Sequence, residues 1–247
     1  MIRIKDYEEL KVRIVNWLKD YYWKYDIKAF VVGVSGGIDS AVVSTLCAET
    51  GFPTYVLTMP LHSKKGNTEL SDAHAKTLSK KYSNVRVVNI DLSNTYESLL
   101  FDIDQDFVNN KLANANTKSR LRMVTLYQVA GSVGGIVVGT GNKVEDYGVG
   151  FYTKYGDGGV DIAPIADLYK TEVRELGGYL GVMNEIIDAT PTDGLWDDGR
   201  TDEDQIGATY AELEEAMENG TGKAVDILYK FNKQNRHKME PIPTFKL

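Results

Sequence analysis

Residues 28–40 read KAFVVGVSGGIDS, and this stretch decides the fold class. The apolar run over 28–34 is typical of a buried strand, and glycine and serine follow it directly. A helix is expected from about residue 39, so the small residues form a strand-to-helix turn. At such a turn, backbone N–H groups and the positive end of a helix converge on one point. The stretch therefore predicts an anion site at the carboxyl end of a strand.

The same alternation of helix and strand continues along the chain. Helical spacing of apolar residues predicts helices over about 5–24, 39–50, 67–81, 93–130, 169–181, 203–218 and 221–234. Short apolar runs predict strands over 28–34, 54–59, 85–90 and 135–139. Strands separated by helices imply an α/β fold with a doubly wound, mostly parallel sheet flanked by helices, as in Rossmann-like proteins. We expect residues 1–247 to form a single domain of this kind.

Composition excludes some classes of function. The net charge of −7, without a block of Lys or Arg, argues against binding to bulk nucleic acid. Charges interrupt the first thirty residues, so we expect neither a signal peptide nor a membrane span, and a cytoplasmic protein. The single cysteine, Cys47, is expected to pack in the core, and three scattered histidines do not favour a His-rich metal site. Any metal is therefore expected to have oxygen ligands.

The residues of the glycine-rich turn indicate what the anion is. Gly36 and Gly37 allow the backbone to approach a phosphate closely, while Ser35 and Ser40 can donate hydroxyl hydrogen bonds without adding bulk. The turn is not a Walker loop, because it lacks the lysine of that motif. Asp39 would repel phosphates unless a divalent cation lay between them, and Mg²⁺ prefers carboxylate and phosphate oxygens. Asp39 therefore predicts magnesium, although Asp39 and Ser40 could also act only as helix caps.

Longer motifs connect the chain to a known family. The segment SGGIDS resembles the pyrophosphate loop of the ATP pyrophosphatases, which adenylate a substrate oxygen with ATP. Residues 116–123 (NTKSRLRM), 139–148 (GTGNKVEDYG) and 151–176 (FYTKYGDGGVDIAPIADLYKTEVREL) look like the ammonia-dependent NAD synthetases within that superfamily. The resemblance runs from the helix before SGGIDS to the C-terminal tail. The departures are Ser119, where the family usually has alanine, and Met59-Pro60, which opens a variable loop.

This resemblance implies an activity and its partners. A member of the family amidates deamido-NAD (nicotinate adenine dinucleotide) with ammonia, and ATP is converted to AMP and pyrophosphate through an adenylated intermediate. It is a ligase that forms a carbon–nitrogen bond, uses Mg²⁺ and is a homodimer. Free ammonia is the expected nitrogen donor, because a glutaminase would need a nucleophilic cysteine and a domain of its own; ammonia from a separate glutaminase subunit is the alternative.

The resemblance also implies roles for individual residues. The residues expected to bind ATP are Gly33, Ser35, Gly36, Gly37, Ile38, Asp39, Ser40, Thr140, Lys170 and Thr192. Those expected to bind deamido-NAD are Asn116, Arg120, Lys154, Asp157, Asp161, His237 and Lys238. The catalytic residues are expected to be Asp39, Lys170 and Asp157, and the metal ligands Asp39 and Glu145.

Several of these residues have a plainer explanation when taken alone. Glu145 could be an acid in the first turn of a helix, and Lys170 a surface lysine at a helix start. Asp157 and Asp161 could cap turns. Side chains spaced by two on a helix point in different directions, so at most one of Arg120 and Arg122 is expected to face the substrate. His237 and Lys238 could belong to a frayed terminus, and Thr192 is unremarkable on its own.

Other functions remain open from the residues themselves. Gly33-Val-Ser35-Gly-Gly37 also fits the G-x-S-x-G elbow of a serine hydrolase, for which His237 is the only late histidine. A different ATP pyrophosphatase, with another acceptor, and a nucleotide-binding regulator are further alternatives. Residues 148–159 are expected to form a binding loop. The acidic run 193–204 is expected to be a solvated loop before a helix capped by Thr201 or Asp202, with closure over the site as a hypothesis.

Overall fold

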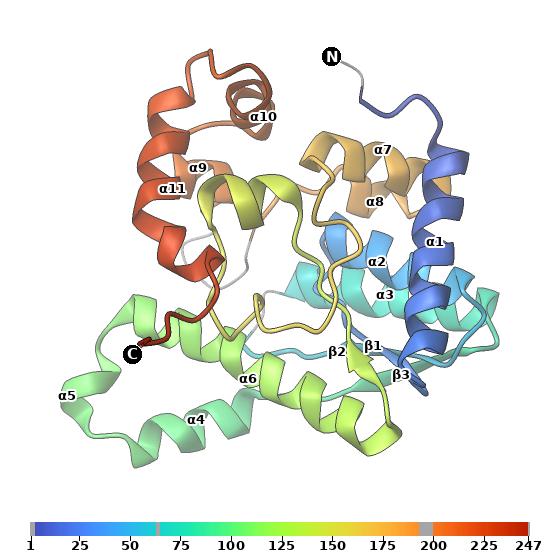
Figure 1. Cartoon of the computed structure of the whole chain (residues 1–247). Coiled ribbons are helices and arrows are strands. Elements are labelled where there is room, and N and C mark those ends of the chain that lie inside the picture. The colour runs from blue at the N-terminus through green and yellow to red at the C-terminus, as the bar shows by residue number, and fades with distance from the viewer. Residues whose placement is uncertain (1–2, 63–64, 193–199, 247) are drawn as a thin grey trace.

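The computed structural model describes residues 3–62, 65–192 and 200–246, and its centre is a four-stranded parallel sheet (Figure 1). The strands are β1 (Phe30–Gly33), β2 (Thr54–Thr58), β3 (Val85–Asn89) and β4 (Ile136–Val137), in the order β3-β2-β1-β4. In the register, Val31 pairs with Tyr55 on one side and with Val137 on the other. The predicted fold class is confirmed.

Alternate residues of β1 face opposite sides of the sheet, and helices cover both sides. Phe30 and Val32 point into a core formed with α1 (Tyr7–Lys24), α2 (Ile38–Glu49) and α7 (Lys170–Leu180), whereas Val31 points into a core beneath α6 (Lys111–Val133). A third cluster joins α3 (Lys65–Lys81) to β2 and β3. Because β1 is buried on both faces, the glycine-rich turn that follows it has a rigid base.

The C-terminal third adds a small layer of helices beside the sheet. The helix η1 (Val144–Val149), a π-helix, packs against α9 (Asp202–Ile206), α10 (Tyr210–Asn219) and α11 (Val225–Met239), as Figure 1 shows. The remaining helices are α4 (Ser93–Asp102), α5 (Gln105–Val108) and α8 (Asn184–Ile187). None of the described helices is long and apolar enough to cross a membrane.

Most predicted elements are found within a few residues of their expected bounds, and the exceptions have local causes. The helix predicted over 203–218 is two helices, because Gly207 adopts φ +85° and ends α9. Thr201 caps α9, as predicted, by accepting a hydrogen bond from the Asp204 amide. The binding loop predicted over 148–159 begins inside η1, which the sequence pattern did not indicate. Residues 193–199 of the acidic run lie outside the described residues.

Candidate active site

A cleft of about 760 Å³ opens at the carboxyl ends of β1 and β4. The chain continues from β1 to β2 on one side of β1, while β4 lies on its other side, so the strand order reverses between β1 and β4. In open parallel sheets, ligands bind at this kind of switch point. The cleft is lined by the turn after β1 together with parts of α6, η1, α7 and α11.

Hydrogen bonds made by Ser35 and Ser40 fix the conformation of the turn from β1 to α2. Ser40 Oγ accepts a hydrogen bond from the Ser35 amide at 3.2 Å and donates one to the Gly37 carbonyl at 3.0 Å. Ser35 Oγ accepts from the Gly37 amide at 3.2 Å. Gly36 has φ +89°, a conformation that favours glycine. Among the described residues, no side chain caps the first turn of α2, so its amides face the cleft as an anion site.

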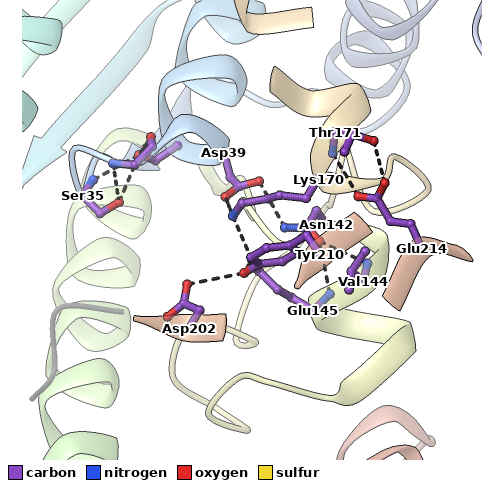
Figure 2. A network of polar contacts seen from close by, with 12 residues as sticks. Ser35, Asp39, Asn142, Val144, Glu145, Lys170, Thr171, Asp202, Tyr210 and Glu214 are labelled. Atoms are coloured by element: carbon purple, nitrogen blue, oxygen red, sulfur yellow. Dashed lines mark hydrogen bonds and ion pairs between the residues drawn. The ribbon is translucent and has the colours of Figure 1, made fainter. Parts of the chain in front are cut away.

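Two carboxylates meet a single ammonium group beside this turn. Lys170 Nζ lies 2.5 Å from Asp39 Oδ2 and 2.8 Å from Glu145 Oε1. Lys170 is the first residue of α7, Asp39 lies in the first turn of α2, and Glu145 lies in η1 (Figure 2). Only 4% of the Lys170 surface is exposed, so this lysine is not a surface residue.

Burial and charge act in opposite directions on these groups. Burial raises the pKa of Asp39, and the Lys170 ammonium offsets only part of that effect. Burial opposes ionisation of Glu145 as well, but Lys170 and the Tyr210 hydroxyl lower the pKa of Glu145 below its usual range. Burial would lower the pKa of Lys170, whereas the two carboxylates raise it overall. We conclude that Lys170 is charged and that Glu145 is its ionised partner.

Asn142 and Tyr210 complete this network, although neither residue was predicted to belong to the site. Asn142 is fully buried; its Nδ2 donates to Asp39 Oδ1 at 3.1 Å, and its Oδ1 accepts from the amides of Val144 and Glu145. Tyr210 donates its hydroxyl to Glu145 Oε1 at 2.7 Å. Asn142 belongs to the quoted GTGN motif and could have been found there. Tyr210 follows a helix cap and carries no comparable signal.

A second group of contacts surrounds Asp157, on the side of the cleft formed by α6. Asp157 Oδ1 accepts from Ser119 Oγ at 2.7 Å and from the Thr153 amide at 3.0 Å, while Ser119 Oγ accepts from the Asp157 amide. Burial raises the pKa of Asp157, and the Ser119 hydrogen bond opposes this. Asn116 accepts a hydrogen bond from Thr153 Oγ1 at 2.8 Å. Asp157 is therefore a fixed acceptor in the wall of the cleft.

The end of α11 is fastened to the loop after η1, so it is not a frayed terminus. Lys238 Nζ donates to the carbonyls of Gly150, at 2.5 Å, and of Tyr152, at 2.8 Å. Lys154 Nζ donates to the carbonyl of His237 at 3.0 Å. These contacts hold Lys154 and Lys238 along the rim as two positive groups that can face an anionic ligand.

The structure brings nearly all predicted site residues together. Those that line the cleft are Gly33, Ser35, Gly36, Gly37, Ile38, Asp39, Ser40, Asn116, Arg120, Thr140, Glu145, Lys154, Asp157, Lys170, Thr192, His237 and Lys238. Among the described residues, Asp161 is the predicted ligand that does not line it. Its carboxylate accepts from the Val137 amide at 2.7 Å and from the Tyr127 hydroxyl at 3.0 Å, which fixes the loop to β4.

Three further predictions can be compared with the contacts. Arg120 and Arg122 both line the cleft, and Arg122 Nε donates a hydrogen bond to the Met59 carbonyl at its border; that at most one of them faces the substrate stays a prediction. Ser35 Oγ contacts Ser40 and the Gly37 amide, which is not the arrangement of a serine activated by histidine. Cys47 is fully buried in the core, as predicted.

Comparisons with known proteins indicate one family. The family model described as NAD synthase matches residues 10–242. The NH(3)-dependent NAD(+) synthetase of Finegoldia magna is 37% identical over 242 residues, 97% of each chain. That of Carboxydothermus hydrogenoformans is 40% identical over 239 residues, 94% of this chain and 95% of the relative.

Solved structures give the same fold. The structure of NMN synthetase from Francisella tularensis has a TM-score of 0.89 and 34% identity, covering 99% of this chain and 100% of the other. The NH3-dependent NAD synthetase from Campylobacter jejuni has a TM-score of 0.78 and 23% identity, covering 98% of this chain and 100% of the other. The second likeness shows the fold alone.

Proposed function

Because the chain belongs to the NAD synthase family, we propose that the cleft beside β1 and β4 is the active site of its reaction. The chain is an ammonia-dependent ligase that uses ATP to amidate deamido-NAD, giving NAD, AMP and pyrophosphate. The observation that carries the assignment is the convergence of Asp39, Glu145 and Lys170 next to an open helix N-terminus. An anion site, two carboxylates and a fixed cation are the groups that phosphoryl chemistry needs.

The residues present fit a magnesium ion. Asp39 and Glu145 come from different elements and already converge on one cation, the Lys170 ammonium. Among the described residues, no group of three or more His, Cys, Asp and Glu side chains could hold a metal. Mg²⁺ is commonly held by one or two carboxylates together with substrate phosphates, which matches this pair. When bound, it would neutralise charge on the phosphate oxygens.

The proposed steps use the chain for positioning and electrostatics. The nicotinate carboxylate attacks the α-phosphorus of ATP, forming a bond to oxygen and releasing pyrophosphate, which the amides of the SGGIDS turn bind. Lys170 stabilises the negative charge that builds on the phosphates. Ammonia then attacks the adenylated carbonyl carbon, and AMP leaves with the carboxylate oxygen. No protein nucleophile takes part, in agreement with the contacts of Ser35.

The acceptor side of the cleft is assigned to the deamido-NAD substrate. Asp157, which Ser119 and Thr153 fix in position, is proposed to orient ammonia and the nicotinyl ring. Lys154 and Lys238 offer positive charge to the diphosphate of the dinucleotide. The other residues assigned here to substrates are Asn116, Arg120 and His237 for deamido-NAD, and Thr140 and Thr192 for ATP.

We also propose that the protein is a cytoplasmic homodimer. Large apolar side chains are exposed on neighbouring elements α4, α5 and α6: Phe101 is 85% exposed, Phe107 72%, Leu112 59% and Val124 57%. Exposed apolar side chains on adjoining elements support the proposal that a partner covers this face. Since α6 also carries Asn116 and Arg120, a partner on this face would lie close to the substrate cleft.

The first experiment is a coupled assay with purified protein, ATP, Mg²⁺, deamido-NAD and ammonium, each omitted in turn. NAD and AMP should form in equal amounts only when all are present. Asp39→Asn should abolish Mg²⁺-supported turnover and leave the fold intact. Asp167→Asn is the matched control, because Asp167 also pairs with a lysine, Lys143, but is largely exposed. Near-normal activity of Asp39→Asn would overturn the metal assignment.

A second candidate substrate is nicotinate mononucleotide, which carries the same reacting carboxylate without the adenylyl half. It is favoured by the likeness to the NMN synthetase structure, with its TM-score of 0.89 at 34% identity. Measuring kcat/KM for the mononucleotide and for deamido-NAD under one set of conditions separates the two. A ratio that favours the mononucleotide would change the preferred acceptor but not the chemistry at Asp39, Glu145 and Lys170.

A further inference from the structure

Tyr210 lies behind the ion-paired groups of the site, at the start of α10. Only 2% of its surface is exposed. Its hydroxyl is 2.7 Å from Glu145 Oε1 and 3.4 Å from Asp202 Oδ2, and Lys170 Nζ lies over its ring, 4.9 Å from the centroid. Figure 2 shows the phenol between Glu145 and Asp202, with the Lys170 ammonium close to it. One side chain therefore contacts both partners of the ion pair.

The two contacts of the hydroxyl are not equal. A neutral phenol has one proton to donate, and the shorter distance identifies Glu145 as its acceptor. A hydrogen bond to an ionised carboxylate is stronger than one between neutral groups. Asp202, the first residue of α9, is buried, and its Oδ2 is a second, more distant acceptor for the same proton.

A second residue on the same face of α10, Glu214, supports the helix that carries Lys170. Glu214 is one helical turn after Tyr210, and its carboxylate accepts from the Thr171 amide at 3.0 Å and from Thr171 Oγ1 at 2.6 Å. Thr171 follows Lys170 in the first turn of α7, so Glu214 fixes the end of the helix that carries the ammonium group. Tyr210 and Glu214 are four residues apart and are therefore neighbours on the helix surface. Tyr210 contacts Glu145, and Glu214 supports the helix that carries Lys170.

We infer that Tyr210 is a positioning residue of the reaction: its hydroxyl holds the Glu145 carboxylate in the orientation in which it faces Asp39. This inference rests on the proposed role of Glu145 and Asp39 as metal ligands. The Glu145 carboxylate is contacted by Lys170 and Tyr210, and the Asn142 side chain also lowers its pKa. If Lys170 turns toward the phosphates of ATP, the hydrogen bond from Tyr210 remains and keeps Glu145 in place. Outer partners of metal ligands have this function in many sites.

The test is Tyr210→Phe, which removes the hydroxyl and keeps the ring in the core. Binding of Mn²⁺, used as a probe for the Mg²⁺ site, is measured by electron paramagnetic resonance with the full protein and α,β-methylene-ATP. We expect Mn²⁺ affinity to fall about 10-fold, with a similar rise in the Mg²⁺ concentration needed for half-maximal turnover. The matched control is Tyr82→Phe, since Tyr82 also donates to a carboxylate, that of Glu49, on the far side of the core. Its Mn²⁺ affinity should not change.

A double-mutant cycle with Glu145→Gln separates this inference from the proposed function. Glu145→Gln should weaken Mn²⁺ binding, and adding Tyr210→Phe to it should have little further effect, because the hydroxyl acts through Glu145. If Glu145→Gln weakens binding but Tyr210→Phe matches wild type and Tyr82→Phe, the role of Tyr210 is wrong. If Glu145→Gln itself leaves binding unchanged, the metal site is wrong and the inference falls with it. Thermal unfolding of each variant shows whether a loss comes from the fold.

Discussion

Replacing Lys170 by methionine should destabilise the protein strongly when no divalent cation is present. The ammonium group is the cation between Asp39 and Glu145, and both carboxylates are largely buried. Removing one partner of a buried ion pair costs about 3–5 kcal/mol of the free energy of unfolding, because a charge is left without compensation. In a chain of this size, a loss of 1 kcal/mol in the free energy of unfolding lowers Tm by about 2–4 °C. We therefore expect Tm to fall by roughly 10 °C in EDTA.

Magnesium should reverse much of this fall in the Tm of Lys170→Met. In the wild-type protein a divalent cation must displace the Lys170 ammonium from the carboxylates, whereas in Lys170→Met the place is open and the need for positive charge is greater. Ligands that bind the folded state raise Tm. Millimolar Mg²⁺ should therefore raise the Tm of the variant by several degrees more than that of wild type.

The assay is thermal unfolding followed by circular dichroism, in EDTA and in Mg²⁺. Lys143→Met is the matched control: Lys143 also pairs with an aspartate, Asp167, but 84% of that side chain is exposed. Exposed pairs contribute at most about 1 kcal/mol, so the control should change little and should not respond to Mg²⁺. A Lys170→Met protein with the Tm of wild type in EDTA, or with the same response to Mg²⁺, would refute the reasoning.

Three other expectations concern stability, the site and assembly. Burial lowers the pKa of His74 to about 4, so below pH 6.5 a proton binds to the unfolded chain before it binds to the folded one. The free energy of unfolding should therefore fall as the pH drops from 6.5 toward 4, by about 3 kcal/mol at 1.36 kcal/mol per pKa unit. His74→Gln should reduce this pH dependence, as measured by urea unfolding at pH 7.5 and at pH 5. Gly141→Ala would place a Cβ 2.1 Å from Asp146 Oδ2, so the Asp146 carboxylate, which lines the cleft, must move; kcat should fall about 100-fold while the protein stays folded, and unchanged kcat would contradict this. Phe107→Glu should convert a dimer to a monomer in analytical ultracentrifugation, and an unchanged sedimentation coefficient would exclude this face.

Local patterns were enough to predict the parts of the site that lie on one turn. The apolar run before SGGIDS, its small residues and the aspartate in the first turn of α2 are close together in the chain, and the structure shows them as one open turn. Lys170 was assigned to the site by resemblance, against the plainer expectation of a surface lysine. Its burial follows from packing of α7 on α2, where Gly177 leaves room for Ile38.

What could not be predicted depends on contacts between distant segments. Tyr210 meets Glu145 across 65 residues, and no spacing rule links a tyrosine after a helix cap to a carboxylate in another helix. The π-helix η1 has no sequence period that separates it from a loop rich in glycine and aromatics. Asp161, an acidic residue of a family motif that was expected to bind deamido-NAD, supports the backbone of β4 and lies outside the cleft lining of the described residues.

The wide separation of the paired groups has a consequence for how the chain folds. Lys170 and Asp39 are 131 residues apart, and Tyr210 comes later still. Contacts that close such long loops form late and slowly, because the entropy of the intervening chain must be lost first. During synthesis, Asp39 and Glu145 leave the ribosome before Lys170 and Tyr210. On refolding from denaturant, helical signal should therefore return before the capacity to bind metal, and the lag between the two measures the last step of assembly.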